Sequence, residues 1–326
     1  MAGDCIRQIP RWGFVLSLAA TILMMAAASA PSLFYPQIAE RLGLIPVATT
    51  LVFAVYTFTL LAALLYLGPL SDHVGRRPVV AAGSLALALS VAMFWFAGSL
   101  AALLVARALQ GLAAGLLIPA LSAMMIDFES PSHRNIAALW NTIGPMIGLG
   151  AGALGAALLL DLTSEPTTAV FGSLVLAFLI VATVVWSTPE LVPKTQIRRG
   201  DLRPRFTVPP HLRRMFTVGV PVIIAGWATN GLFLALGADL VGSELGGSTH
   251  TQAGIVLFAL AISGVTASSV LQRRSARTIS LYATSALAFG TAVSIGALAL
   301  GSYPAYVASV AIVGSGFGTA FLGVLR

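Results

Sequence analysis

The stretch Gly68–Pro78, GPLSDHVGRRP, gathers an acid, a histidine and two adjacent arginines in a chain of which only 9% is charged. Asp72 can pair with Arg76, and it can accept hydrogen bonds from backbone N–H groups at a helix N-terminus. Gly68 and Gly75 permit a tight turn and a close approach of helices. These residue types predict a polar turn whose chemistry is ion pairing within the protein.

The remaining polar residues give little support for a catalytic site. The four histidines stand in separate loops, without a His-x-x-x-His pair or paired carboxylates: His73, His133, His211 and His250. No Gly-Lys-Ser/Thr phosphate-binding loop is present. Cys5 is the only cysteine, which excludes a disulfide within the chain and a cysteine-cluster metal site. We therefore expect no enzyme activity, no metal site and no cofactor.

Arg107 lies within an apolar run, where an arginine costs about 2.5–3.5 kcal/mol on insertion scales. Its guanidinium must face a cavity or a partner, or else extend to the nearby outer surface. All eleven acids fall in expected loops or at helix ends. We therefore expect no carboxylate deep within a span, and acids such as Asp72 and Asp127 stand at helix ends.

The elements that carry these residues are apolar helices. The chain has 326 residues, 58% of them hydrophobic, which with 9% charge indicates an integral membrane protein. Ala and Leu dominate without strand-like alternation, so the fold class expected is an all-α bundle. We predict ten spans, at 12–35, 47–67, 79–97, 101–125, 136–160, 168–186, 214–237, 252–271, 280–299 and 303–324.

The distribution of basic residues sets the expected orientation. Sixteen of the 18 Lys and Arg residues fall on one side when the N-terminus is inside, whereas Arg41 lies outside and Arg107 within a span. This asymmetry places both termini in the cytoplasm. It also explains the net charge of +7 without nucleic acid as a partner.

A Pro-rich, basic loop divides the expected spans into two halves. We predict a six-helix N-terminal half at 1–187, a cytoplasmic linker at 188–213 and a four-helix C-terminal half at 214–326. The halves look like parallel repeats. A shift of 200 residues lays Gly75 over Ser275 and Arg77 over Arg277, and Gly111 and Gly115 match Gly314 and Gly318 at an offset of 203.

The turn at 68–77 resembles the signature loop between helices 2 and 3 of the major facilitator superfamily, roughly G-x-L-x-D-x-x-G-R-[RK]. The matching residues are Gly68, Leu70, Asp72, Gly75, Arg76 and Arg77. The resemblance implies a latch that holds the two halves together when the outside is open. It also implies a normal total of twelve spans, so we expect either an incomplete version of a longer protein or a shortened transporter, with a helix that partners Asp72 missing.

Two further segments resemble motifs of the same family. Arg107, Gln110 and Gly111 are similar to its helix-4 motif R-x-x-Q-G, for which the family implies a role in proton coupling. Gly144, Pro145 and Gly148 partly match the Gly-Pro motif of its antiporters, although Leu149 replaces the last glycine. This second segment equally fits a glycine-packed, kinked helix.

Aromatic and amide side chains are candidates for the wall of a substrate cavity. The candidates are Tyr35, Tyr56, Trp140, Asn141, Trp227 and Asn230. A wall of this kind favours neutral or amphipathic organic substrates, although each residue also fits helix packing or a membrane interface.

The resemblance implies a multi-pass transporter of the plasma (inner) membrane that moves a small organic or drug-like solute by alternating access. Proton-coupled efflux is the favoured mode. An uptake carrier for a metabolite, or a truncated inactive or regulatory membrane protein, remains open. The sequence leaves the substrate, the direction of transport and the oligomeric state undetermined.

Overall fold

The computed structural model describes residues 12–130, 136–192 and 213–324, and these residues form helices without any strand. All ten predicted spans correspond to helices. Those of the first half are α1 (Trp12–Ser29), α3 (Pro46–Leu67), α5 (Arg76–Trp95), α6 (Leu100–Asp127), α7 (Ile136–Leu162) and α8 (Pro166–Val184). Those of the second half are α9 (Arg213–Ser243), α10 (His250–Leu271), α11 (Ala276–Ala299) and α12 (Tyr303–Val324).

Eight helical segments among the described residues are long and apolar enough to cross a membrane. They correspond to the first six and the eighth and ninth predicted spans. The predicted all-α membrane bundle is thereby confirmed. Cys5, His133, His211 and most of the expected linker lie outside the described residues.

The first span differs from its prediction, which ended it at residue 35. Helical structure continues to Leu42 through a 3-10 turn, η1 (Ala30–Phe34), and a further helix, α2 (Tyr35–Leu42). Pro31 and Pro36 each stand in the first turn of a new segment. Proline lacks the N–H that a continuous helix needs, so each one marks a change of helix type and not the end of the span.

The predicted turn at 68–77 contains a short helix, α4 (Leu70–Val74), and α5 begins at Arg76. The prediction that the third span begins at residue 79 is therefore wrong by one turn. Gly75 separates the two helices with φ 106° and ψ 156°, a left-handed conformation that L side chains rarely adopt. The glycine thus permits the sharp change of direction that puts both arginines on the first turn of α5.

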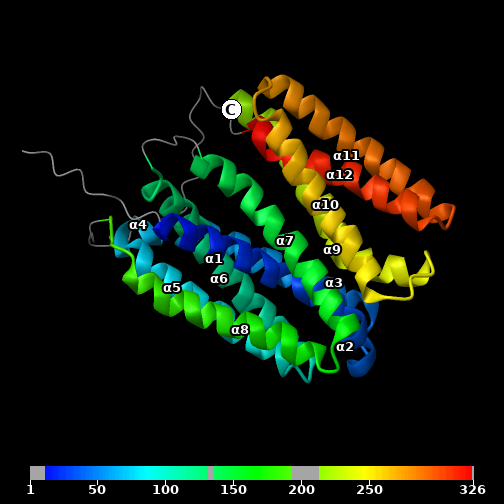
Figure 1. Ribbon diagram of the computed structural model, residues 1–326, viewed down its shortest axis with the longest axis horizontal. Helices are drawn as coiled ribbons and strands as arrows, with labels where there is room; N and C mark the ends of the chain where they lie inside the picture. Colours follow the sequence, from blue (N-terminus) through cyan, green and yellow to red (C-terminus); the bar gives the residue numbers. More distant parts are fainter. Residues whose placement is uncertain (1–11, 131–135, 193–212, 325–326) are drawn as a thin grey trace, which may run out of the picture.

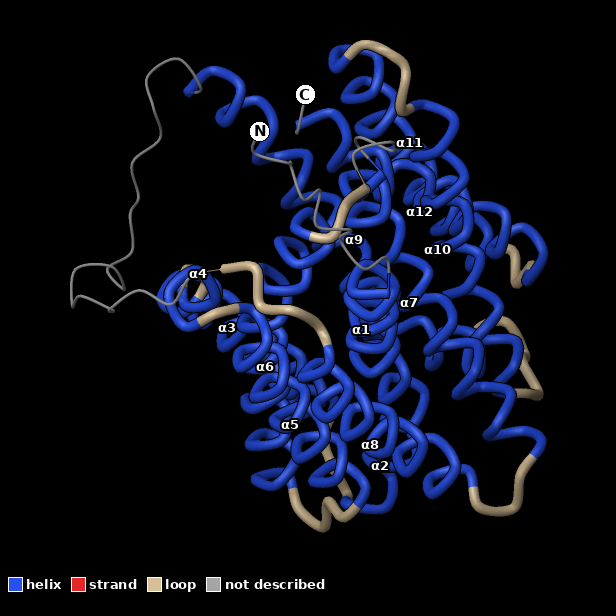
Figure 2. Tube along the Cα trace, turned by 60° about the vertical axis from the view of Figure 1, so that its left-hand side comes forward, coloured by secondary structure: helices blue, strands red, loops and turns tan. Residues whose placement is uncertain are grey.

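The helices divide into two groups that meet along α7 and α10. Figure 1 shows α10 to α12, in yellow to red, on one side of α7, with α1, α5, α6 and α8 on the other. Figure 2 shows the same division after a turn of 60°. Small residues allow this close approach: a Cβ on Gly150 would lie 2.6 Å from Ala261 Cβ, and one on Gly254 would lie 2.5 Å from Ala157 Cβ.

The glycines that the proposed repeat superposes have equivalent packing positions in the two halves. Gly111 and Gly115 of α6 lie directly against the backbone of α3, whereas Gly314 and Gly318 of α12 lie against that of α10. Each pair therefore brings the fourth helix of its half close to the second. Small side chains are what such close backbone contacts require in a membrane, where no hydrophobic force drives helices together.

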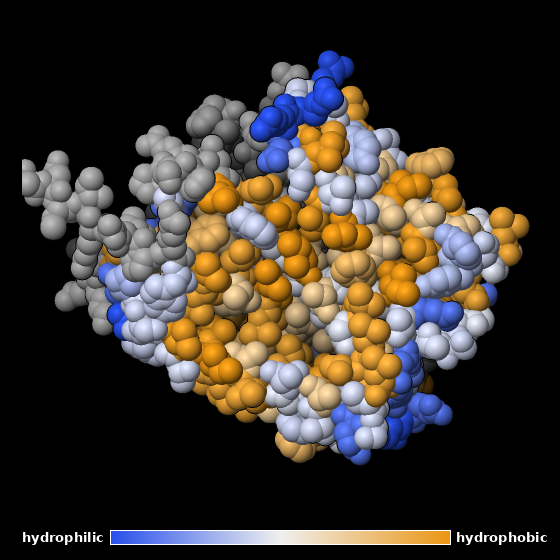
Figure 3. Space-filling model, in the orientation of Figure 1, coloured by the Kyte–Doolittle hydropathy of each residue, from blue (hydrophilic) through white to orange (hydrophobic). Residues whose placement is uncertain are grey.

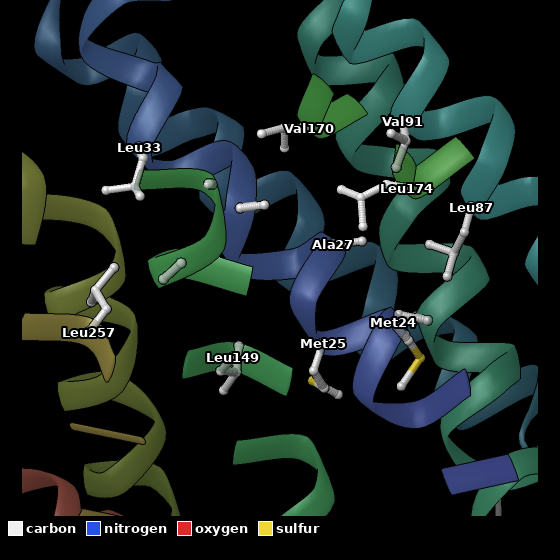
Figure 4. Close-up of a cluster of buried hydrophobic side chains, with 14 of the residues drawn as sticks. Met24, Met25, Ala27, Leu33, Leu87, Val91, Leu149, Val170, Leu174 and Leu257 are labelled. Atoms are coloured by element: carbon white, nitrogen blue, oxygen red, sulfur yellow. The ribbon is translucent and has the colours of Figure 1, made fainter. Parts of the chain in front are cut away.

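The core of the bundle is apolar across both groups. Figure 4 shows Met25 of α1 toward Leu149 of α7 and Met24 on the side of Leu87 of α5, and Leu257 of α10 belongs to the same buried cluster. Figure 3 shows a broad band of apolar surface with hydrophilic side chains gathered toward two opposite edges. This distribution matches a protein whose middle faces lipid and whose ends face water.

Candidate functional site

Arg107 lies in the first third of α6 and is 1% exposed. The alternative in which its side chain extends to the outer surface is therefore wrong. The guanidinium turns into the first half of the bundle, where it contacts side chains of α2, α3 and α5. A cation buried this fully at membrane depth requires compensation from its surroundings.

Neutral polar groups supply part of that compensation. Arg107 Nε donates to Tyr35 Oη at 2.5 Å, and its Nη1 donates to Gln110 Oε1 at 2.5 Å. Gln110 Nε2 in turn donates to the carbonyl of Ala27 at 2.9 Å. This chain of hydrogen bonds ties α6 to α2 and α1, and it places the two polar residues of the expected helix-4 motif in one network.

Aromatic rings supply the rest. The guanidinium carbon lies 5.0 Å from the Phe94 ring centre, 5.3 Å from Tyr35, 5.4 Å from Phe53 and 5.5 Å from Tyr56. Each distance is within the range of a cation–π attraction. The sequence reasoning missed Phe53 and Phe94 as partners. Nothing in the local sequence marks them, because they come from two other helices.

No described carboxylate forms an ion pair with Arg107, and its Nη2 atom has no hydrogen-bond partner among the described residues. The guanidinium of arginine stays protonated in proteins. The site therefore holds a fixed positive charge in a medium of low dielectric constant, and the two N–H bonds of Nη2 have no acceptor among the described residues.

A second polar cluster is centred on Arg76, where α4, α5 and α6 meet. Its Nη1 pairs with Asp72, and its Nε lies 3.1 Å from Asp127 Oδ2 at the end of α6. Nη1 also donates to Ser71 Oγ at 2.8 Å. The expected pairing of Asp72 with Arg76 is present, and Asp127 is a partner that sequence reasoning did not assign.

Glu190 caps the N-terminus of α5. Its two carboxylate oxygens accept from the backbone N–H groups of Arg76 and Arg77, each at 3.0 Å. We expected Asp72 in this role, so that expectation is corrected. Gly75 leaves room for the carboxylate, since a Cβ there would lie 2.7 Å from Glu190 Oε2. Because Glu190 is 114 residues away from Arg76 in the chain, the sequence around α5 does not indicate this cap.

The remaining residues of the loop motif have structural partners. Arg77 donates to the Trp186 carbonyl at 2.6 Å, and its guanidinium carbon lies 5.3 Å from the Trp186 ring. Trp186 belongs to η3 (Val185–Ser187), the turn that ends α8. The loop between α3 and α5 is therefore fixed to the segment that follows α8, the last helix of the same half. Gly68 and Leu70 flank the turn at the end of α3 and the start of α4.

The Gly-Pro segment lies inside α7 with Pro145 in mid-helix. A Cβ on Gly148 would lie 2.3 Å from the Ile22 carbonyl of α1, and one on Gly144 would lie 3.1 Å from Leu18. These glycines thus form the contact of α7 with α1, while Gly150 faces α10. The geometry agrees with a packing role and leaves the antiporter interpretation a prediction.

The candidate cavity residues do not all gather in one place, although Tyr35 and Tyr56 both lie against Arg107. Tyr35 belongs to the Arg107 network, and half-buried Asn141 donates weakly to the Ser122 carbonyl at 3.4 Å. Trp227 is 45% exposed and meets Phe317 edge-on, with ring centres 5.5 Å apart. Asn230, one turn further along α9, is 1% exposed. Their roles in binding stay predictions.

Comparison with known proteins agrees with this geometry. Residues 16–325 match the family model described as Major Facilitator Superfamily. The multidrug efflux pump LfrA of Mycolicibacterium smegmatis is 31% identical over 229 residues, which cover 67% of this chain and 41% of that protein. The puromycin resistance protein pur8 of Streptomyces alboniger is 32% identical over 148 residues, covering 44% of this chain and 29% of the relative. The chain thus spans less than half the length of these two relatives.

Solved structures share the fold. A bacterial homolog of the human lysosomal transporter Spinster, in an inward-facing and unoccupied conformation, superposes with a TM-score of 0.68 at 14% identity. The alignment covers 96% of this chain and 73% of that one. Since the family model covers nearly the whole chain and the helical bundle agrees with it, this multi-pass membrane protein belongs to the Major Facilitator Superfamily, a family of transporters and not of enzymes.

Proposed function

We propose that the protein exports a small organic or drug-like solute across the plasma membrane by alternating access, driven by the proton gradient. Relatives that are 31% identical over 229 residues and 32% identical over 148 residues are described as a multidrug efflux pump and a puromycin resistance protein. The two helix groups provide the units that would rock against one another, and α7 with α10 would form the line along which they move.

The buried charge of Arg107 is the observation that supports proton coupling in this proposal. A fixed cation at membrane depth is functional by default, because its burial is costly. It makes entry of a further cation or free proton into this half unfavourable. Protons would then bind at the helix ends, where Asp72 and Asp127 face Arg76. Protonating either one removes an ion pair that holds the 68–77 loop.

The surroundings of the expected path fit an amphipathic solute. Half-buried Trp140 and Asn141 on α7 and exposed Trp227 on α9 offer flat apolar rings and an amide. Such surfaces bind organic molecules through stacking with few fixed polar contacts. We expect uncharged or weakly basic aromatic compounds to be carried in preference to small ions.

Everted membrane vesicles from cells that produce the full chain test this proposal. Radiolabelled puromycin should accumulate inside them when respiration makes their interior acidic, and a protonophore should abolish the accumulation. Arg107→Ala should leave residual flux that no longer responds to the proton gradient. Arg107→Lys serves as the matched control, because it keeps the positive charge and loses the planar stack. Gradient-dependent accumulation by Arg107→Ala would remove Arg107 from the coupling scheme, and absence of puromycin flux in the wild-type protein would reject puromycin export.

A further inference from the structure

Asp161 connects the two halves at the end of the molecule opposite the Arg76 cluster. It is the penultimate residue of α7, in the first half, and it lies beside the first turn of α10, in the second half. Both of its carboxylate oxygens are occupied. Oδ1 accepts from the His250 backbone N–H at 3.1 Å and contacts the ring Nδ1 at 2.8 Å.

The other oxygen holds the next residue. Oδ2 accepts from the Thr251 backbone N–H at 2.7 Å and from the Thr251 hydroxyl at 2.5 Å. A carboxylate from one half thus caps the N-terminus of a 22-residue helix of the other half. The positive end of the helix dipole favours a negative charge at this place.

Gln37 of α2 completes the contact from the first half. Its Nε2 lies 3.2 Å from His250 Nε2. A neutral histidine that carries its proton on Nδ1 can donate to Asp161 and accept from Gln37, so both ring nitrogens are satisfied. Asp161 is the acid whose carboxylate contacts the His250 ring among the described residues. A hollow of about 270 Å³, lined from the first half by Leu33 and Pro36 and from the second by Val241 and Thr249, lies beside the contact.

We propose that Asp161, His250, Thr251 and Gln37 form an outer clamp, a set of contacts that must break before the outer side can open between the halves. The close contact of α7 with α10, made by small residues such as Gly150 and Gly254, ends at this clamp. When the two halves rock about this line of contact, the clamp residues at its end separate further than the residues near its middle. The Arg76 cluster, at the other end, makes its contacts within the first half. The clamp would therefore favour the outward-closed conformation.

This inference takes its physiological meaning from the proposed transport cycle, but its test needs no substrate. The chain would carry Cys5→Ser together with Gly98→Cys and Glu244→Cys, on outer loops of the first and second half. Spin labels at the two cysteines would report the separation of the halves by double electron–electron resonance in lipid nanodiscs. Gly98 has open space for a side chain, and Glu244 is exposed.

Asp161→Asn is the principal variant, because it removes the charge and one of the two acceptor oxygens while keeping the shape. We expect the ratio of long to short distances to rise about fivefold or more, the lower end of typical coupling between conformational states. Glu165→Gln is the matched control. It makes the same chemical change in the same outer loop, where the side chain caps no helix, and should leave the distances unchanged.

Distances in Asp161→Asn that equal those of the wild-type protein would overturn the clamp. If this variant does not reach the membrane, Thr251→Val decides, since it removes one donor to Asp161: a smaller shift toward long distances supports the clamp, and no shift rejects it. A distance shift in a protein without puromycin flux would support the clamp and reject puromycin export. The two proposals therefore fail separately.

Discussion

Arg107 keeps its charge at membrane depth through neutral partners. Four aromatic rings lie 5.0 to 5.5 Å from its guanidinium, and a phenol and an amide accept its hydrogen bonds. Each cation–π contact can be worth about 2 kcal/mol or more when it is desolvated. Such an arrangement stabilises the cation with neutral groups alone. A carboxylate partner would instead place a second charge in the membrane.

Replacing Tyr35 with phenylalanine should destabilise the protein by about 1–3 kcal/mol, because the buried Nε–H of Arg107 would lose its acceptor. The ring itself would remain, so the cation–π contact should persist. Tyr66→Phe is the control, since Tyr66 is 53% exposed on α3. Thermal unfolding in detergent would measure both variants. Equal unfolding midpoints for them would mean that the Tyr35 hydroxyl contributes nothing to holding Arg107.

The sequence predicted that Arg107 needs a cavity or a partner, but it left the partners unnamed. Tyr35 is 72 residues away in the chain, and the rings of Phe53 and Phe94 arrive on separate helices. Contacts of this kind depend on the rotation of each helix about its axis. Among apolar helices that rotation leaves almost no periodic signal, because lipid-facing and buried positions are both apolar.

At the scale of the helix, glycine decides which elements touch. A Cβ on Gly148 of α7 would lie 2.3 Å from a carbonyl of α1, whereas a Cβ on Gly155 of the same helix would meet no atom of another element within 4 Å. Gly148→Ala should therefore cost about 1–3 kcal/mol of stability by forcing the helices apart. Gly155→Ala should be neutral, or stabilising by up to about 1 kcal/mol through helix propensity.

Thermal unfolding of the two alanine variants in the same detergent provides the comparison. If Gly148→Ala unfolds at the wild-type temperature, the seam between α1 and α7 tolerates an added methyl group, and close packing is not what fixes glycine at this position. A fall for both variants would point instead to a general intolerance of alanine in α7.

Helix existence was predictable, whereas helix ends were not. Long apolar runs gave all ten helices, since a bilayer demands about 20 apolar residues for each span. The extension to Leu42 was missed because α2, with the sequence YPQIAERL, is largely polar and does not continue the apolar run. The early start of α5 was missed because its cap, Glu190, is remote in sequence.

At the scale of the whole molecule, the 68–77 loop is fixed within one half and presents Asp72 outward. The Asp72 side chain is 59% exposed and pairs with Arg76. Asp72→Asn should reduce puromycin accumulation strongly, because the loop would lose the charge that the proposed latch uses. Folding should change little, since an exposed ion pair contributes only modestly to stability.

The vesicle assay and the amount of protein in the membrane check this expectation together. Glu165→Gln, an outer-loop carboxylate without a place in the latch, is the control. Wild-type flux in Asp72→Asn would reject the latch assignment. Loss of the variant from the membrane would show that Asp72 acts in folding, which also contradicts it.

The two N-caps that the repeat superposes differ in when they can form. Ser275 accepts from the Thr278 N–H three residues away, so α11 carries its own cap as soon as it is made. The cap of α5 is Glu190, 114 residues downstream of Arg76. During synthesis the first turn of α5 must therefore wait, with open N–H donors, until three further helices have entered the membrane. The six-helix half completes its own assembly only when Glu190, near the start of the linker, has left the ribosome.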